Sequence, residues 1–224
     1  MDKQSLMQRN NLIRAAVMGA NDGILSVSGI ILGVAGATSD TGTILLAGFA
    51  GMLAGTVSMA MGEYVSVSSQ HDAQEKVRQI QTNALATNYD EEFSYVEDKY
   101  VADGISPHLA QQATKEMMSK DALTTTVRER YGFSLNHELS AGGAALASLI
   151  SFPIGSILPM LAISTAPKDM REIATFISVI IALALTGYAS AILNGSNKKR
   201  VALRNVVAGI FTMIATYAIG SLFR

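Results

Sequence analysis

A carboxylate interrupts an apolar stretch of this chain that is long enough to cross a membrane. Between Leu12 and Thr38 the charged residues are Arg14 and Asp22. A bilayer core about 30 Å thick holds about 20 apolar residues of α-helix, so Asp22 would lie below the membrane surface. An ionised carboxylate there costs about 2.5–3.5 kcal/mol, and such residues commonly mark an ion or substrate pathway. Asp22 is therefore the first candidate functional residue. The alternative is that it caps a broken helix or pairs with another span.

Four more apolar runs are long enough to cross a bilayer. They are Ile44–Val67, Ala141–Ile163, Ile173–Leu193 and Val201–Phe223. Lipid cannot satisfy backbone hydrogen-bonding groups, so spans of this length are helical. The mean hydropathy of +0.30 is modest for a membrane protein, so a polar part is also expected. The sequence predicts an all-α polytopic membrane protein with five transmembrane helices. Two of them lie in residues 1–67, a cytoplasmic helical insert occupies 68–138, and three helices follow in 139–224.

The basic residues predict the orientation of the spans. A cytoplasmic N-terminus places most of the 17 Lys and Arg residues in the cytoplasm, including the short SNKKR loop before the last span. Short loops of this kind carry the positive-inside signal, so we expect the N-terminus inside and the C-terminus outside. No cleavable signal peptide is recognisable, so the first span would target the chain. Short loops and the lack of a sorting extension favour a bacterial plasma membrane.

The polar insert shows helical periodicity and contains residues that typically begin or end helices. Its first helix is expected to continue the second span into the cytoplasm. A second helix, near Asp90–Asp103, ends before Gly104, which is suited to a left-handed conformation. Ser106 and Pro107 then open a third helix, because Pro is favoured in the first turn. A last turn or short helix, Asp121–Tyr131, stops at Gly132.

Metal binding is limited by the absence of cysteine. Any metal must be held by oxygen, imidazole or thioether groups. Met59 and Glu63 are four residues apart, so they share one face of the second span. A thioether beside carboxylates suits iron or manganese better than calcium or magnesium, which prefer oxygen alone. The alternative is that Met59 only fills space in the packing.

Glycines spaced four apart mark the first two spans. The pairs are Gly19 and Gly23, Gly29 and Gly33, and Gly51 and Gly55. Such faces let helix backbones approach closely in lipid. The pattern fits tight packing within one subunit and a dimer interface equally well.

Two long motifs give the chain a family resemblance. GANDGILSVSGIILGVAGA in the first span and LAGTVSMAMGEYVSVSSQHDAQ in the second resemble the vacuolar iron transporter family, which also includes bacterial iron and manganese exporters. Further similarity in the insert and later spans extends over the whole chain. The resemblance implies five transmembrane helices per subunit, a homodimer, and exchange of ferrous iron or manganese for protons. The family's first-span Asp corresponds to Asp22, and its second-span Met to Met59.

The chain also departs from the family pattern. Gly51 stands where plant-type members have a Glu, so part of the membrane site is missing or is replaced by Glu63. The resemblance implies that the cytoplasmic insert of those members binds metal through several Glu residues and a pair of Met residues. In this chain, Thr126 and Val127 stand at the positions of that Met pair. Met117 and Met118 lie earlier and are interpreted as packing residues. Acidic candidates for metal capture remain, although charge runs are usually solvated faces. They are Glu91, Glu92, Glu97, Asp98, Glu116, Asp121 and Glu129.

These observations predict a proton-coupled exporter of iron(II) or manganese(II). Asp22 would exchange a proton for the metal, Met59 would add a soft ligand, and Glu63 would gate or relay at the cytoplasmic mouth. The expected partners are divalent metal ions, protons, the bilayer and a second copy of the chain, with no resident cofactor and no nucleic acid. The alternative is a metal sensor or buffer that the spans only anchor. The chain has no His-Glu zinc pattern, nucleophile elbow or phosphate loop, so an enzyme is not expected.

Overall fold

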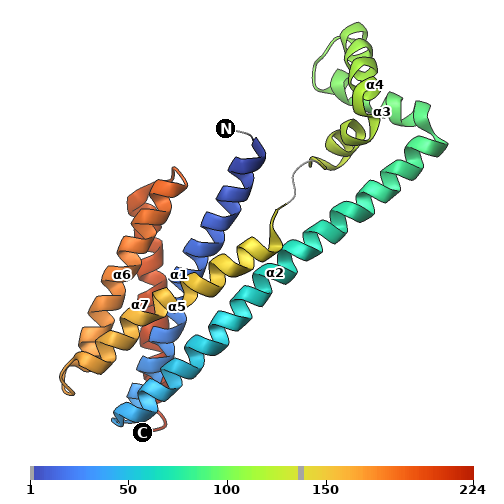
Figure 1. Cartoon of the computed structure of the whole chain (residues 1–224). Helices are drawn as coiled ribbons and strands as arrows, with labels where there is room; N and C mark the ends of the chain where they lie inside the picture. Colours follow the sequence, from blue (N-terminus) through green and yellow to red (C-terminus); the bar gives the residue numbers. More distant parts are fainter. Residues whose placement is uncertain (1–2, 136–138) are drawn as a thin grey trace. The chain divides into compact units, whose positions relative to one another are not determined.

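The computed structural model describes residues 3–135 and 139–224, and most of these residues lie in helices (Figure 1). Residues 136–138, at the predicted end of the insert, lie outside the described ranges. The helices are α1 (Lys3–Ala37), α2 (Thr41–Thr87), α3 (Tyr89–Ala102), α4 (Pro107–Tyr131), α5 (Ala141–Thr165), α6 (Arg171–Leu193) and α7 (Lys198–Ser221). The described part contains no β-strand, which confirms the all-α prediction.

Five of these helices are long and apolar enough to cross a membrane. They are α1 from Gln8, α2, α5, α6 and α7, in agreement with the five predicted spans. Contacts divide the chain into two compact units. The membrane unit comprises Arg9–Val65 and Ser140–Arg224, and the insert unit comprises Met1–Gln8 and Ser66–Leu139. Helix α2 contributes residues to both units.

Small residues allow α1 and α5 to pack at close range in the membrane unit. A Cβ atom on Gly23 would lie 2.1 Å from the carbonyl oxygen of Phe152, and one on Gly155 would lie 2.1 Å from that of Ala20. The hydroxyl group of Ser156 donates to the carbonyl oxygen of Gly23 across the same contact. Side chains larger than hydrogen at these two glycines would therefore force the helices apart.

The predicted glycine pairs all face helices of the same chain. Gly19 and Gly23 face α5, Gly29 and Gly33 face α7, Gly51 faces α1, and Gly55 faces the ring of Phe152. This placement supports tight packing within one subunit as the role of these glycines. The homodimer stays a prediction.

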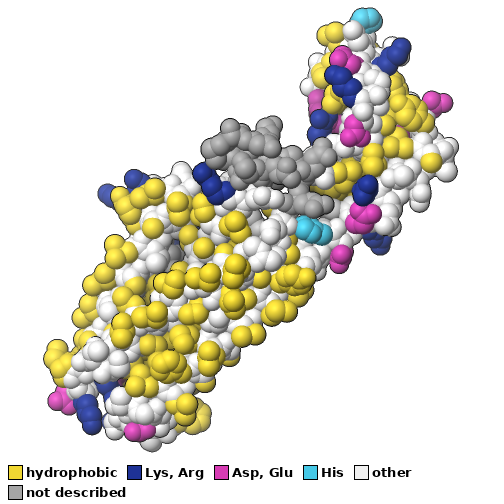
Figure 2. All heavy atoms as spheres, viewed as in Figure 1, with side chains coloured by type: hydrophobic (Ala, Val, Ile, Leu, Met, Phe, Trp, Pro, Cys, Tyr) yellow, Lys and Arg dark blue, Asp and Glu magenta, His cyan; other side chains and the backbone are white. Residues whose placement is uncertain are grey.

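The membrane unit has an apolar interior and an apolar exterior. Ile31, Phe152, Leu183 and Met213 are almost fully buried in its core. Many large hydrophobic side chains of its helices are exposed. On the face shown in Figure 2, hydrophobic side chains cover most of this unit and charged groups gather toward the helix ends. An apolar exterior is what a lipid-facing bundle requires, because lipid gives no compensation for exposed polar groups.

In the insert unit, α3 and α4 pack together beside the last part of α2. Ser106 precedes α4 and Pro107 occupies its first turn, as predicted. Gly104 and Gly132 have φ values of +93° and +76°, in the left-handed region that glycine adopts readily. Asp121 has non-helical backbone angles and divides α4 at the point where the sequence predicts a new helix.

The insert core is small. Val96, Tyr100, Ala110 and Met118 form it, and Met117 packs against them. The Met117 and Met118 pair therefore packs between insert helices, as predicted.

Candidate functional site

Asp22 lies within the continuous helix α1, on a partly buried face of the membrane unit. The hydroxyl group of Ser26, one turn further along, donates to the Asp22 Oδ1 atom at 2.8 Å. No Lys or Arg side chain in the described ranges forms an ion pair with Asp22. Because α1 is unbroken there, Asp22 does not cap a broken helix, and its carboxylate has no cationic partner in these ranges.

Asn21, the residue before Asp22, belongs to a cluster of polar side chains. The Asn21 Oδ1 atom accepts hydrogen bonds from the Asn205 Nδ2 atom at 3.1 Å and from the Thr186 hydroxyl group at 3.4 Å. These bonds link α1 to α7 and α6 inside the membrane unit. This cluster was not predicted from the sequence. An Asn within each of two apolar spans is nevertheless a recognisable signal, because buried amides need hydrogen-bond partners.

Glu63 is almost fully buried, with 6% of its surface exposed. The Arg14 Nη2 atom lies 3.1 Å from the Glu63 Oε2 atom and joins α1 to α2. Arg14 also donates to the Asn11 Oδ1 atom at 3.2 Å, and about half of its side chain remains exposed. Asp22 is eight residues beyond Arg14, which is about 12 Å along the helix axis. The sequence identified Arg14 as a charge in the span but not as the partner of Glu63.

Met59 is half-buried one turn before Glu63 and packs against the apolar core of the membrane unit. In the ranges that the structure covers, no hydrogen bond joins Asp22 to Met59 or Glu63. A Cβ atom on Gly51 would lie 2.4 Å from the Ile30 Cδ1 atom, so that position has no room for a carboxylate without repacking. No group of three or more His, Asp or Glu side chains that could hold a metal was found among the described residues.

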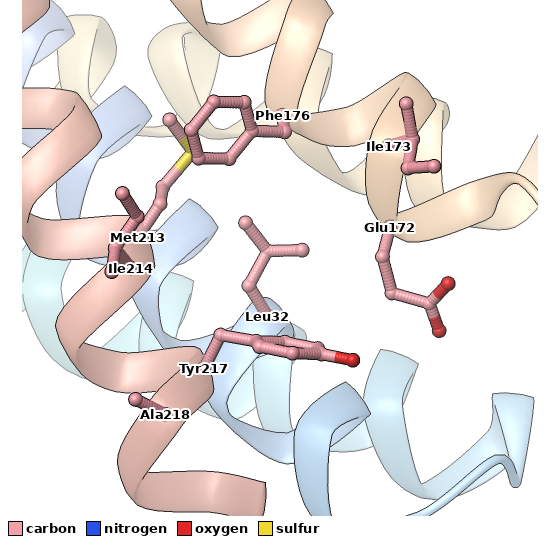
Figure 3. Close-up of a pocket in the computed structure, with 8 residues that line it drawn as sticks. All are labelled: Leu32, Glu172, Ile173, Phe176, Met213, Ile214, Tyr217 and Ala218. Atoms are coloured by element: carbon pink, nitrogen blue, oxygen red, sulfur yellow. The ribbon is translucent and has the colours of Figure 1, made fainter.

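An apolar pocket of about 450 Å³ opens elsewhere in the membrane unit, between α1, α6 and α7 (Figure 3). Leu32, Phe176 and Met213 contribute to its walls, with Glu172 and Tyr217 as its polar members. The Glu172 carboxylate accepts from the Nε atom of the buried Arg171 at 3.2 Å. A divalent cation needs several oxygen ligands, so this pocket does not suit one.

Glu92 is the most deeply buried acid of the predicted insert set, with 6% of its surface exposed. Arg130 donates to both of its carboxylate oxygens, from Nη2 at 3.0 Å and from Nε at 3.2 Å. The Gln81 amide group also donates to Glu92. The guanidinium carbon lies 3.8 Å from the centre of the Tyr95 ring.

Glu129 is also held by basic groups. Lys99 Nζ lies 3.0 Å from one of its oxygens, and the other accepts from Tyr100 and Arg128. Burial alone would raise the pKa of Glu129, but these hydrogen bonds outweigh burial and hold the pKa below its usual value. The hydrogen bond to Glu129 in turn raises the pKa of Lys99.

The other predicted insert acids are more accessible. Glu91, Asp98, Glu116 and Asp121 are exposed, and Glu97 is half-buried. Glu116 pairs with Lys120 at 3.4 Å, and Asp121 accepts from the backbone N–H of Thr124 at 2.9 Å.

The two positions that match the family's Met pair are buried. The Thr126 hydroxyl donates to backbone carbonyl oxygens within α4, and Val127 lies beside it. Neither side chain offers a soft ligand. The role of the ten predicted metal ligands stays a prediction.

Comparison with known proteins agrees with the resemblance seen in the sequence. The model of the VIT family matches residues 13–221. A "Vacuolar iron transporter" of Acanthamoeba castellanii is 32% identical over 214 residues, covering 94% of this chain and 78% of the relative. "Vacuolar iron transporter homolog 5" of Oryza sativa subsp. japonica is 30% identical over 224 residues, covering 100% and 86%. "Vacuolar iron transporter homolog 2.1" of Arabidopsis thaliana is 29% identical over 216 residues, covering 95% and 82%.

Proposed function

Because the chain belongs to the VIT family, with relatives named vacuolar iron transporters, we propose that it exports ferrous iron or manganese from the cytoplasm in exchange for protons. Membership of this family and five membrane-spanning helices support metal transport across a membrane rather than enzymatic chemistry. The exchange, the manganese substrate and the outward direction are parts of the proposal.

The observation that carries the proposal is the carboxylate of Asp22. It lies in a membrane helix, and its one hydrogen bond in the described structure comes from the neutral Ser26 hydroxyl group. A carboxylate without a resident cation can bind either a proton or a metal ion. Competition between the two for the same oxygens would couple their movement in opposite directions.

Met59 and Glu63 have separate roles in this proposal. The Met59 thioether would favour iron or manganese over magnesium. Glu63 would control entry, because its carboxylate is already bound to Arg14 and an arriving cation has to compete with the guanidinium group. Gly51 offers no ligand, so coordination is completed by water or by residues of a second chain.

Orientation, membrane and assembly belong to the same proposal. The excess of basic residues on one side supports a cytoplasmic N-terminus and insert, with the C-terminus outside. We place the protein in a bacterial plasma membrane, although its named relatives are described as vacuolar. A homodimer would supply a second copy of each site residue. A membrane-anchored sensor or buffer is less suitable, because an anchor gains nothing from an intramembrane acid.

Transport by the purified protein in liposomes tests the proposal. Metal flux is followed with an indicator dye, and proton flux with a pH dye in the same vesicles. Asp22→Asn keeps the size of the side chain and removes its exchangeable charge, so both fluxes should collapse. Ser68→Ala, at a half-buried position outside the membrane unit, is the control for insertion and handling. Wild-type flux in a well-inserted Asp22→Asn protein would refute the mechanism, and metal flux without proton movement would refute the exchange.

A further inference from the structure

We propose that Arg130 is the permanent counter-cation of the insert unit, so that this unit folds without metal and contains no high-affinity metal site. The proposal concerns the insert alone and does not depend on whether the membrane unit transports metal. It rests on one arrangement of charge, in which the guanidinium group of Arg130 neutralises Glu92 where three helices meet.

The arrangement brings together residues from α2, α3 and α4. Gln81 is 1% exposed and Glu92 is 6% exposed, so their contact is shielded from water. Arg130 reaches both oxygens of Glu92, which is the two-pronged geometry that a planar guanidinium group makes with a carboxylate. The face of the Tyr95 ring lies 3.8 Å from the guanidinium carbon and adds a cation–π contact.

A buried carboxylate needs a cation, and here the chain supplies it. An unpaired charge in a protein interior is strongly destabilising, so burying Glu92 requires a bound metal, a basic side chain or a proton. Arg130 meets that requirement, because its guanidinium group supplies the positive charge in direct contact with the carboxylate. Both Glu92 oxygens are engaged, so a divalent ion would have to displace the guanidinium group and break its bidentate contact.

The second buried acid is neutralised in the same way. Glu129 has 12% of its side chain exposed and contacts Lys99, Arg128 and the Tyr100 hydroxyl group. The accessible acids share no such basic partner, although Asp121 lines a polar pocket together with His71, Asp72 and Glu75. Among the described residues, no three acidic or His side chains are grouped for metal coordination. A metal site would need carboxylates without basic partners, whereas the two buried carboxylates of the insert, Glu92 and Glu129, are held in ion pairs.

The same arrangement predicts how a metal site could be created. Replacing Arg130 with Glu would place two carboxylates and the Gln81 amide oxygen at one buried position. Carboxylate and amide oxygens are the ligands that manganese accepts, so Arg130→Glu should make the stability of the insert depend on Mn²⁺.

The experiment uses the full-length protein in detergent with Asp22→Asn in every variant, which removes the membrane carboxylate. Bound Mn²⁺ is measured by the loss of the free-ion signal in electron paramagnetic resonance. Hydrogen exchange of peptides from residues 76–131 reports the stability of the insert with and without chelator. The parent protein should bind Mn²⁺ no more tightly than about 1 mM, as expected of scattered surface acids. Its exchange should be unchanged by chelator.

Arg130→Glu should bind one Mn²⁺ per chain, and the metal should slow exchange in α3 and α4. Glu92→Gln added to Arg130→Glu should abolish both effects. Lys120→Glu, an exposed charge reversal on the same helix, is the matched control and should gain neither. If Arg130→Glu fails to fold even with Mn²⁺, Arg130→Gln offers a neutral replacement. Hydrogen exchange of the insert peptides should then be faster in Arg130→Gln than in the parent at every metal concentration.

Two results would overturn the proposal. One is Mn²⁺ binding by the parent at micromolar concentration that Glu92→Gln removes. The other is an insert whose hydrogen exchange is unchanged in Arg130→Gln, because Arg130 would then not be needed to hold Glu92.

Discussion

Arg14 and Glu63 form an ion pair between α1 and α2, with 3.1 Å between the Arg14 Nη2 and Glu63 Oε2 atoms. The Glu63 side chain is almost fully buried, while about half of the Arg14 side chain remains exposed. A cation that approaches Glu63 therefore meets a carboxylate that already has a partner. Under the proposed role of Glu63 in metal entry, this pair would link the stability of the helix pair to access to the membrane path.

A charge swap separates the two roles of this pair. Arg14→Gln leaves the buried Glu63 carboxylate without its cation and should lower stability by about 1–3 kcal/mol. The double change Arg14→Glu with Glu63→Arg should recover most of that loss, because the pair is restored in reverse. Metal flux of this double variant should remain below that of the wild type, because the carboxylate now lies on α1. Thermal unfolding by circular dichroism and liposome flux are compared for the same preparations. Recovery of both quantities would show that the pair is purely structural.

Met59 should set the preference for iron or manganese over magnesium. Met59→Ala removes a thioether without changing charge, so competition by magnesium against manganese should increase by about tenfold, which corresponds to about 1.4 kcal/mol of lost discrimination. The measurement is inhibition of manganese uptake by magnesium in liposomes. Met61→Ala is the matched control, because Met61 lies on the same helix and is 55% exposed. Equal competition by magnesium in the wild type would disprove the role of the thioether.

The helical architecture could be predicted from the sequence because its causes are local. Apolar runs of spanning length determine the five membrane helices, and Gly104, Pro107 and Gly132 mark the ends of the insert helices. Even the division of α4 at Asp121 coincides with a predicted helix start.

Contacts between individual side chains were harder to predict from the sequence, because they join residues that are distant along the chain. Arg14 and Glu63 are 49 positions apart, and Glu92 and Arg130 are 38 apart. Asn21 and Asn205 are separated by 184 positions. A run of acids in the insert looks uniform in sequence, yet Glu92 is buried in an ion pair while its neighbour Glu91 is exposed. Packing of the helices determines that difference.

The accessible insert acids should act only by long-range attraction. Neutralising Glu91, Glu97 and Asp98 while leaving Glu92 in place should raise the metal concentration for half-maximal flux about two- to threefold at low salt. The effect should fade near 0.15 M salt, where the Debye length is about 8 Å. Maximal flux should not change. Liposome transport at two ionic strengths measures both quantities. Loss of flux at saturating metal would mean that these acids belong to the translocation path.

The ion pairs of Glu129 should make the insert sensitive to acid. The partners of Glu129 hold its pKa below the usual value of 4.5, so the folded state favours the ionised form more than the unfolded state does. The resulting stabilisation is present above the unfolded pKa and is lost as the pH falls through the lower folded pKa. Glu129→Gln should therefore destabilise the insert at pH 7, and the difference from the wild type should shrink below about pH 4.5.

Hydrogen exchange of the insert peptides, corrected for intrinsic rates at each pH, measures that difference. Glu116→Gln is the control, because its pair with Lys120 is 3.4 Å long and highly exposed. Exposed pairs of this kind contribute little to stability, so this variant should follow the wild type at every pH. A difference between Glu129→Gln and the wild type that grows with acidity would contradict the assigned direction of the pKa shift. No difference at pH 7 would mean that the ion pairs of Glu129 do not stabilise the insert.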